Sequence, residues 1–142
     1  MAIFGVWRNG YLQINGVSLH DHAREISIEA SVSEIPASVH GDTVARVVPG
    51  LEDWTISVTF LQDFAAAKVD QTLTALAYTT QSPTGFPIIV GADATTAVSS
   101  TNPRYSGNAI LAAYSPMHGP HGSNLEATAK FRCTSTLVRT TS

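Results

Sequence analysis

The clearest alternation of hydrophobic and polar positions lies between Val48 and Leu76. It starts at Pro49-Gly50, a pair that favours a turn. A strict period of two follows, which is typical of a β-strand with one buried and one solvent-facing side. The apolar side of this predicted strand consists of Trp54, Ile56, Val58 and Phe60, and its polar side of Thr55, Ser57 and Thr59.

The period then changes to that of a helix. Asp63 is a favourable N-cap residue, and the residues after it carry an apolar stripe of Val69, Leu73 and Leu76. We therefore expect a helix over about residues 64–78. A strand and a helix that each have one apolar side predict that the helix covers the sheet. In this core Trp54, Ile56, Val58 and Phe60 pack with Val69, Leu73 and Leu76.

The residues before this stretch predict further strands. Asn15-Gly16 between two short alternating runs is a strong signal for a β-hairpin, and Glu25–Ala30 alternates again. Residues 31–47 lack a sustained period and contain Pro36 and Gly41, so we expect a long loop there, with 43–48 as a candidate short strand.

The second half of the chain is β-rich. The predicted strands are Phe86–Val90, Asn108–Tyr114, Leu125–Cys133 and a short run at Leu137-Val138. With no internal repeat and 142 residues, we expect a single domain over 1–142. About seven strands and one helix predict an α+β fold that is mainly antiparallel β.

Charge changes the picture of the surface. Charged residues make up 13% of the chain, against about 25% in soluble domains. Residues 1–70 carry nine acids and four bases, whereas residues 71–142 carry two acids and four bases. One interpretation is a Ser/Thr-rich surface that is polar but uncharged. The other is that neighbouring copies cover much of this surface, because interface cores are depleted in charge.

Strand edges support the second interpretation. Open edges pair with other chains unless charges, bulges or prolines protect them. The chain has only two lysines, Lys68 and Lys130. We therefore expect edges that join copies into a closed ring or barrel.

Candidate chemistry is sparse. His20 and His22 lie two residues apart, but a metal site needs further ligands, and Cys133 lies on the apolar side of its strand. We expect no metal, no cofactor and no catalytic residue, and the acidic balance without Lys/Arg clusters argues against a nucleic-acid-binding surface. The sequence also lacks a secretory signal pattern and an apolar run long enough to span a membrane, so we expect no membrane insertion.

The run PGLEDWTISVTFLQDFAAAKVDQTL resembles the central signature of the major tail (tail tube) proteins of long-tailed bacteriophages. Downstream, STNPRYSG at 100–107 is similar to a second motif of that family. His40-Gly41-Asp42 lies where the family often has Phe-Gly-Asp, with His40 departing from the aromatic residue. The resemblance covers roughly residues 10–140.

The resemblance implies a β-sandwich or split barrel with one flanking helix. It also implies hexameric rings that stack head to tail into a tube, which houses the tape measure protein and conducts DNA during ejection. The tail terminator and distal tail proteins are further implied partners. The implied location is the virion tail, with the host cytoplasm during assembly. The alternative is a tube subunit of a contractile tail or of a secretion-like injection machine.

Two sets of residues follow as candidates. The polar sides of two strands are candidates for the lumen wall, with ordinary solvent exposure as the alternative because Lys130 and Arg132 lie on a comparable face. The loop at 31–47 is the candidate inter-ring contact. The lumen set is Glu25, Ser27, Glu29, Thr55, Ser57 and Thr59, and the inter-ring set is Glu34, Ile35, Pro36, Val39, His40 and Asp42.

Two other classes were weighed. A ligand-binding barrel needs inward aromatic residues and converging polar groups, and an enzyme needs titratable groups on facing strands. The sequence shows neither pattern.

Overall fold

A computed structural model describes residues 9–77 and 83–142. Its strands form one antiparallel sheet in the order β2-β1-β5-β6-β7-β4-β3, and β8 pairs with β6 off this path. One helix accompanies this 8-stranded sheet, which confirms the predicted mainly antiparallel α+β class. The elements are β1 (Tyr11–Ile14), β2 (Val17–Ser18), β3 (Ala23–Pro36), β4 (Val47–Leu61), α1 (Val69–Ala77), β5 (Phe86–Gly91), β6 (Arg104–His118), β7 (Glu126–Cys133) and β8 (Val138–Thr140).

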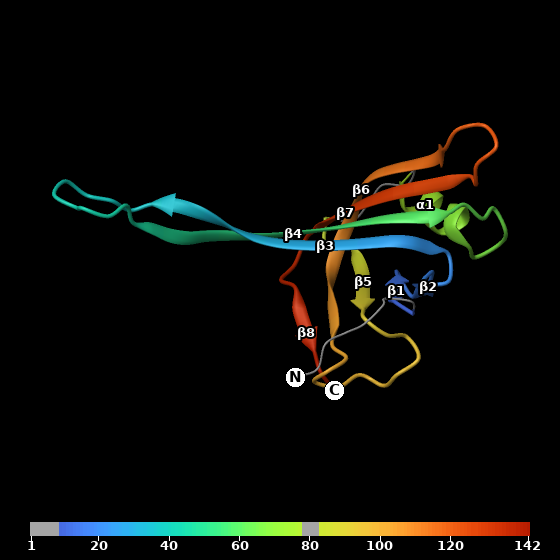
Figure 1. Ribbon diagram of the computed structural model, residues 1–142, viewed down its shortest axis with the longest axis horizontal. Coiled ribbons are helices and arrows are strands. Elements are labelled where there is room, and N and C mark those ends of the chain that lie inside the picture. The colour runs from blue at the N-terminus through green and yellow to red at the C-terminus, as the bar shows by residue number, and fades with distance from the viewer. Residues whose placement is uncertain (1–8, 78–82) are drawn as a thin grey trace.

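The long strand β6 divides the sheet into two layers. Its first part, from Arg104 to Ala109, pairs with β5, and its later part pairs with β7. The sheet therefore folds over along β6, with β3, β4 and β7 on one side and β1, β2 and β5 on the other (Figure 1). β2 and β3 are the ends of the strand order and do not pair with each other, so this is a split barrel rather than a closed one.

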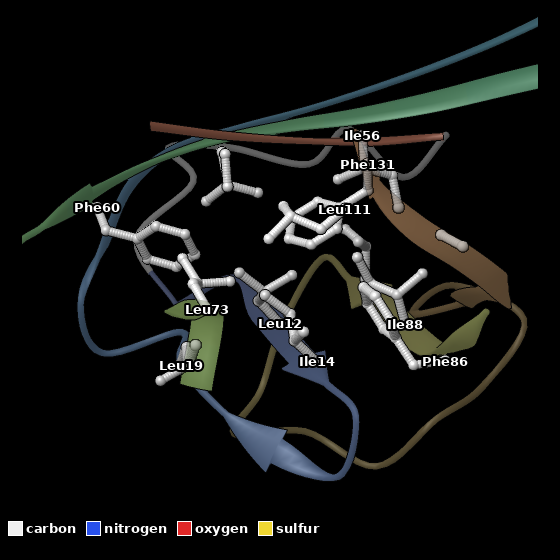
Figure 2. Close-up of a cluster of buried hydrophobic side chains, with 14 of the residues drawn as sticks. Leu12, Ile14, Leu19, Ile56, Phe60, Leu73, Phe86, Ile88, Leu111 and Phe131 are labelled. Atoms are coloured by element: carbon white, nitrogen blue, oxygen red, sulfur yellow. The ribbon is translucent and has the colours of Figure 1, made fainter. Parts of the chain in front are cut away.

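The strand around Trp54–Phe60 and the helix contribute to one core. Apolar residues of both layers and of α1 form one buried cluster, and Figure 2 shows Leu73 pointing into it with Leu12 and Phe60. Leu76 lies at the margin and is only partly buried. The predicted members that are fully enclosed are Trp54, Ile56, Val58, Phe60, Val69 and Leu73.

Trp54 occupies the end of the core where β4 meets β6. Its indole Nε1 donates to the carbonyl of Ser135 at 2.8 Å. A Cβ atom at Gly107 would lie 2.6 Å from the Trp54 ring, so only glycine leaves room for the indole at this point. The buried indole thereby gains both close packing and a hydrogen bond.

The helix starts later than predicted. Residues 64–68 form a turn, in which Ala67 has a left-handed φ of 59°. The carboxylate of Asp63 accepts the Ala65 N–H at 2.9 Å, and the side-chain oxygen of Gln71 accepts the Ala67 N–H. Asp63 therefore stabilises this turn and is not the N-cap of α1. The predicted last residue, Tyr78, lies outside the described residues.

The predicted loop at 31–47 is wrong at both ends. The β3–β4 pairing extends from Ala23↔Phe60 to Pro36↔Val47 with two register shifts, so residues 31–36 belong to β3 and Val47 to β4. We call residues 31–52 the arm; this part of the hairpin extends far from the body of the molecule (Figure 1). A register shift between Val32 and Glu34 interrupts the alternation, which hides the strand from an analysis of period.

Pro49-Gly50 belongs to β4 and is not a turn. Gly50 lies opposite the register shift, where a Cβ atom would lie 2.2 Å from Ser33 Oγ. That hydroxyl accepts the Leu51 N–H at 2.9 Å. Glycine at this position leaves room for the Ser33 hydroxyl to reach the neighbouring strand, and the arm continues past it as a two-stranded ribbon.

Candidate assembly surfaces

The six residues predicted to line a lumen lie together on one face. They are three cross-strand pairs, because β3 and β4 are in register in this region and their buried residues alternate with them. We call this polar side of β3, β4, β7 and the later part of β6 the wall face. The pairs are Glu25↔Thr59, Ser27↔Ser57 and Glu29↔Thr55.

The wall face continues onto β7 and brings in positive charge. Thr55 pairs with Arg132 and Ser57 with Lys130, so the basic residues share the face of the predicted lumen set. Arg132 Nη2 lies 2.9 Å from the carboxylate of Asp53. The face is therefore of mixed sign and is not uniformly acidic.

A second ion pair spans the face near the other end of β4. Arg24, at the register shift of β3, contacts the carboxylate of Glu126 in β7. Leu61 of β4 is the strand partner of Glu126, so this ion pair reaches across β4. Side chains of the wall face thus bridge strands that are not direct neighbours.

Two strand edges flank the wall face. Among residues 9–77 and 83–142, β3 pairs only with β4, and the Ala113–His118 part of β6 pairs only with β7. Each of the three pairings from β3 to β6 is antiparallel, so β3 and β6 run in opposite directions. A second copy in the same orientation would present its β3 antiparallel to this β6.

The arm exposes apolar side chains that contribute nothing to the core. Leu51 is 85% exposed, and the cross-strand partners Ile35 and Val48 are 49% and 44% exposed. Apolar side chains gathered on one projecting ribbon mark an interaction surface. The exposed set on the arm is Val32, Ile35, Val39, Val44, Val47, Val48 and Leu51.

The tip of the arm is ordered by its own hydrogen bonds. The Asp42 carboxylate accepts the Val39 N–H at 2.8 Å and lies 3.4 Å from Arg46. The Ser38 hydroxyl accepts the Arg46 N–H at 2.7 Å. Asp42, predicted as an inter-ring residue, therefore holds the turn within the subunit, whereas His40 beside it is exposed.

All six predicted inter-ring residues lie on the arm. Glu34, Ile35 and Pro36 are in β3, and Val39, His40 and Asp42 are in the tip. Three further exposed apolar residues of the arm, Val47, Val48 and Leu51, are not among the predicted inter-ring residues. The sequence does indicate them, because they are apolar residues next to Pro49-Gly50 that lie outside the alternating pattern of the predicted core strand.

One polar cluster, around His22, has well-defined geometry. His22 Nδ1 lies 2.8 Å from Asp21, and its Nε2 lies 2.8 Å from Asp63. An ionised carboxylate only accepts hydrogen bonds, so both ring nitrogens donate when His22 is protonated. The hydrogen bond with Asp21 raises the pKa of His22, and Asp63 adds to this effect. The cluster joins the turn before β3 to the segment before α1.

Two features of the described residues concern metal binding and membrane insertion. No group of three or more His, Cys, Asp or Glu side chains is arranged to hold a metal ion in residues 9–77 and 83–142. Within the same residues, no helix is long and apolar enough to cross a membrane.

Comparison with known proteins places the fold. No protein-family model matches the sequence, and no curated protein matches it. Among solved structures, a chain of an extracellular contractile injection system (PVC sheath/tube terminator) aligns with a TM-score of 0.73 at 7% identity, over 99% of this chain and 98% of that one. A chain of the PVC sheath–tube complex aligns with a TM-score of 0.71 at 10% identity, over 99% of this chain and 93% of that one.

A third similar structure comes from another kind of particle. A chain in the tail of an empty GTA particle, determined with C6 symmetry, aligns with a TM-score of 0.67 at 10% identity, over 84% of this chain and 82% of that one. This protein has the tail-tube fold. The tail-tube fold was the expectation drawn from the resemblance, and the alignments over nearly the whole chain confirm it.

Proposed function

We propose that this protein is a structural subunit of a phage-type tail tube. Six copies form a ring, and rings stack head to tail into a hollow tube. The observation that carries the proposal is the wall face, a polar sheet surface bounded by two open strand edges of opposite direction. The tail-tube fold of the similar chains supports it.

Ring closure follows from strand direction. In a cyclic ring all copies have the same orientation, so the β3 edge of one copy meets the β6 edge of the next in an antiparallel pair. Each copy then contributes β3, β4, β7 and the later part of β6 to a continuous barrel. Such closure satisfies the backbone groups that both edges leave unpaired in the single chain.

The wall face is proposed to line the lumen. The buried side of the same strands faces the subunit's own core, so closing the barrel leaves the wall face on the inside. Uncharged Ser27, Ser57, Thr55 and Thr59 separate the charges on this face. A conduit for DNA must not hold it, and a wall in which acidic and basic groups nearly balance offers few net phosphate contacts.

The arm is proposed to join successive rings. Its exposed apolar side chains include Ile35, Val48 and Leu51, and it extends beyond the body along the direction of β4 (Figure 1). Docking onto the adjacent ring buries this surface, which favours stacking by the hydrophobic effect.

The remaining roles follow from tube formation. The tube houses the tape measure protein, conducts DNA during ejection, and ends at terminator and distal tail proteins. Its location is the virion, after assembly in the host cytoplasm. The role is mechanical and not enzymatic. The alternative, a tube of a contractile tail or injection machine, is favoured by the PVC alignments, and a sheath gene next to this one distinguishes the two.

Thiol accessibility in assembled particles tests this proposal. In a Cys133→Ala background, Ser57→Cys places a thiol on the wall face and Ser18→Cys places one on β2 in the opposite layer; both serines are exposed in the single chain. A bulky maleimide is expected to modify both cysteines in free subunits, but only the cysteine at position 18 in tubes. Equal reaction of both positions in tubes contradicts the lumen assignment.

A further inference from the structure

The wall face contains charges that its own subunit leaves unpaired. Arg24 is paired with Glu126 and Arg132 with Asp53. Lys130, Glu25 and Glu29 have no ion-pair partner in the described part of the chain. All three lie on this face, the glutamates on the β3 edge and the lysine one strand in from the β6 edge.

We propose that Lys130 forms ion pairs with Glu25 and Glu29 of the adjacent copy. These pairs would cross the joint between two copies in the ring, where β3 of one copy pairs with β6 of the next. The inference rests on the proposed ring. It names the charged side chains that set the register between adjacent copies. The ligand of this lysine is thus a second copy of the same chain.

The surroundings of Lys130 fit this role. Its strand partner on β6 is Ala113, and a depression beside it is lined by Ser57, Val58, Ala113, Tyr114, Ser115, Thr128, Ala129 and Lys130. The residue directly between Lys130 and the β6 edge is therefore a small one.

The distance is within reach of these side chains. Neighbouring strands are about 4.8 Å apart, so β7 of one copy and β3 of the next are separated by about 10 Å with β6 between them. The Arg24–Glu126 pair already spans β3 and β7 across β4 within one subunit. The joint repeats this arrangement with β6 in place of β4.

Register is the property that such pairs control. A slip of one residue at the joint would turn Ile26 and Ile28 of β3 toward the lumen. Backbone hydrogen bonds alone do not distinguish two-residue slips, which keep the same face inward. Ion pairs between one lysine and two flanking glutamates distinguish the correct register from a two-residue slip, because a slip changes the distance between the opposite charges.

Charge reversal tests the inference. Lys130→Glu alone, and Glu25→Lys with Glu29→Lys, are each expected to weaken every joint by about two- to fivefold, the range for a partly exposed ion pair. The protein concentration needed for half-maximal assembly, measured by light scattering, should therefore rise. The variant that carries all three changes restores opposite charges and should assemble as the wild type does.

Controls separate the possible failures. Lys68→Glu changes the only other lysine, which precedes α1 and is not part of the wall face, and should assemble normally. Free subunits of the Lys130, Glu25 and Glu29 variants should melt like the wild type, because these three charges have no ion-pair partner within the described part of the subunit. Normal assembly of Lys130→Glu, or failure of the triple variant to recover, overturns the ion pair. Absence of any wild-type ring overturns the proposed function instead.

Discussion

At the scale of residues, buried side chains determine the stability of the free subunit. Phe60 is fully enclosed between β4 and α1, whereas Phe64, four positions later, is 56% exposed. Phe60→Ala is expected to lower the free energy of unfolding by about 3–5 kcal/mol through lost burial and a residual cavity. Phe64→Ala, the matched control, should change it by less than about 0.5 kcal/mol. Denaturant unfolding of the free subunit measures both values, and similar losses for the two variants would contradict the core described above.

His22 makes stability depend on pH. Its pKa is raised in the folded state by hydrogen bonds to Asp21 and Asp63, so its contribution is complete below its ordinary pKa of about 6.5. The contribution is lost as pH rises through the raised value. The pKa values of Asp21 and Asp63 are lowered, mainly by the His22 hydrogen bond for the first and the Ala65 N–H for the second. Their contribution is lost as pH falls through the lowered values.

The melting temperature of the free subunit should therefore decrease as the pH rises from about 6.5 through the raised pKa of His22. His22→Gln is expected to remove most of this decrease. His121→Gln, which changes an exposed histidine in the β6–β7 turn, should retain it. If the wild type and His22→Gln show the same slope, the two carboxylates do not hold a protonated imidazole.

At the scale of elements, the proposed assembly assigns ring stacking to the arm, which contributes nothing to the core. Ile35 and Val48 face each other in the ribbon and are both exposed. Ile35→Ser with Val48→Ser is expected to leave the melting temperature of the subunit unchanged, because neither side chain reaches the core. Rings should then form without elongating into tubes, as seen by electron microscopy. Val138→Ser on β8 removes a side chain that is 53% exposed and is the matched control. Long tubes of the double variant would show that this part of the arm is not the stacking contact.

Elements differ in how far the sequence predicts them. The strand around Trp54 to Phe60 and its polar side were predictable because one face is buried, which imposes a period of two. The arm has no buried face, so its pairing depends on backbone hydrogen bonds and a register shift near Ser33 that leave no period. The start of α1 was misplaced because Ala67 takes a left-handed conformation, which its residue type does not indicate.

Surfaces were predictable only in part. The alternation at Glu25–Ala30 identified one side of the wall face. That this side aligns in register with Thr55, Ser57 and Thr59, and continues to Lys130, depends on strand order. Strand order is a property of the whole sheet, so single-strand patterns do not contain it.

At the scale of the whole molecule, the layers, edges and arm are arranged for repetition. The edge of β3 and the later part of the edge of β6 are open within the described residues, and the four strands of the wall face connect them. In the proposed assembly, rotation of copies joins the edges and translation along the arm joins the rings. The same chain would then supply both sides of each contact, as a heterologous assembly that closes in one direction and extends in the other requires.

Electron microscopy of the purified, concentrated protein tests this account most directly. The predicted result is hollow rings or tubes with six subunits in each ring. The β3–β4–β7–β6 wall should surround an open lumen. A protein that stays monomeric at high concentration, or that assembles with the wall face outward, would contradict the account.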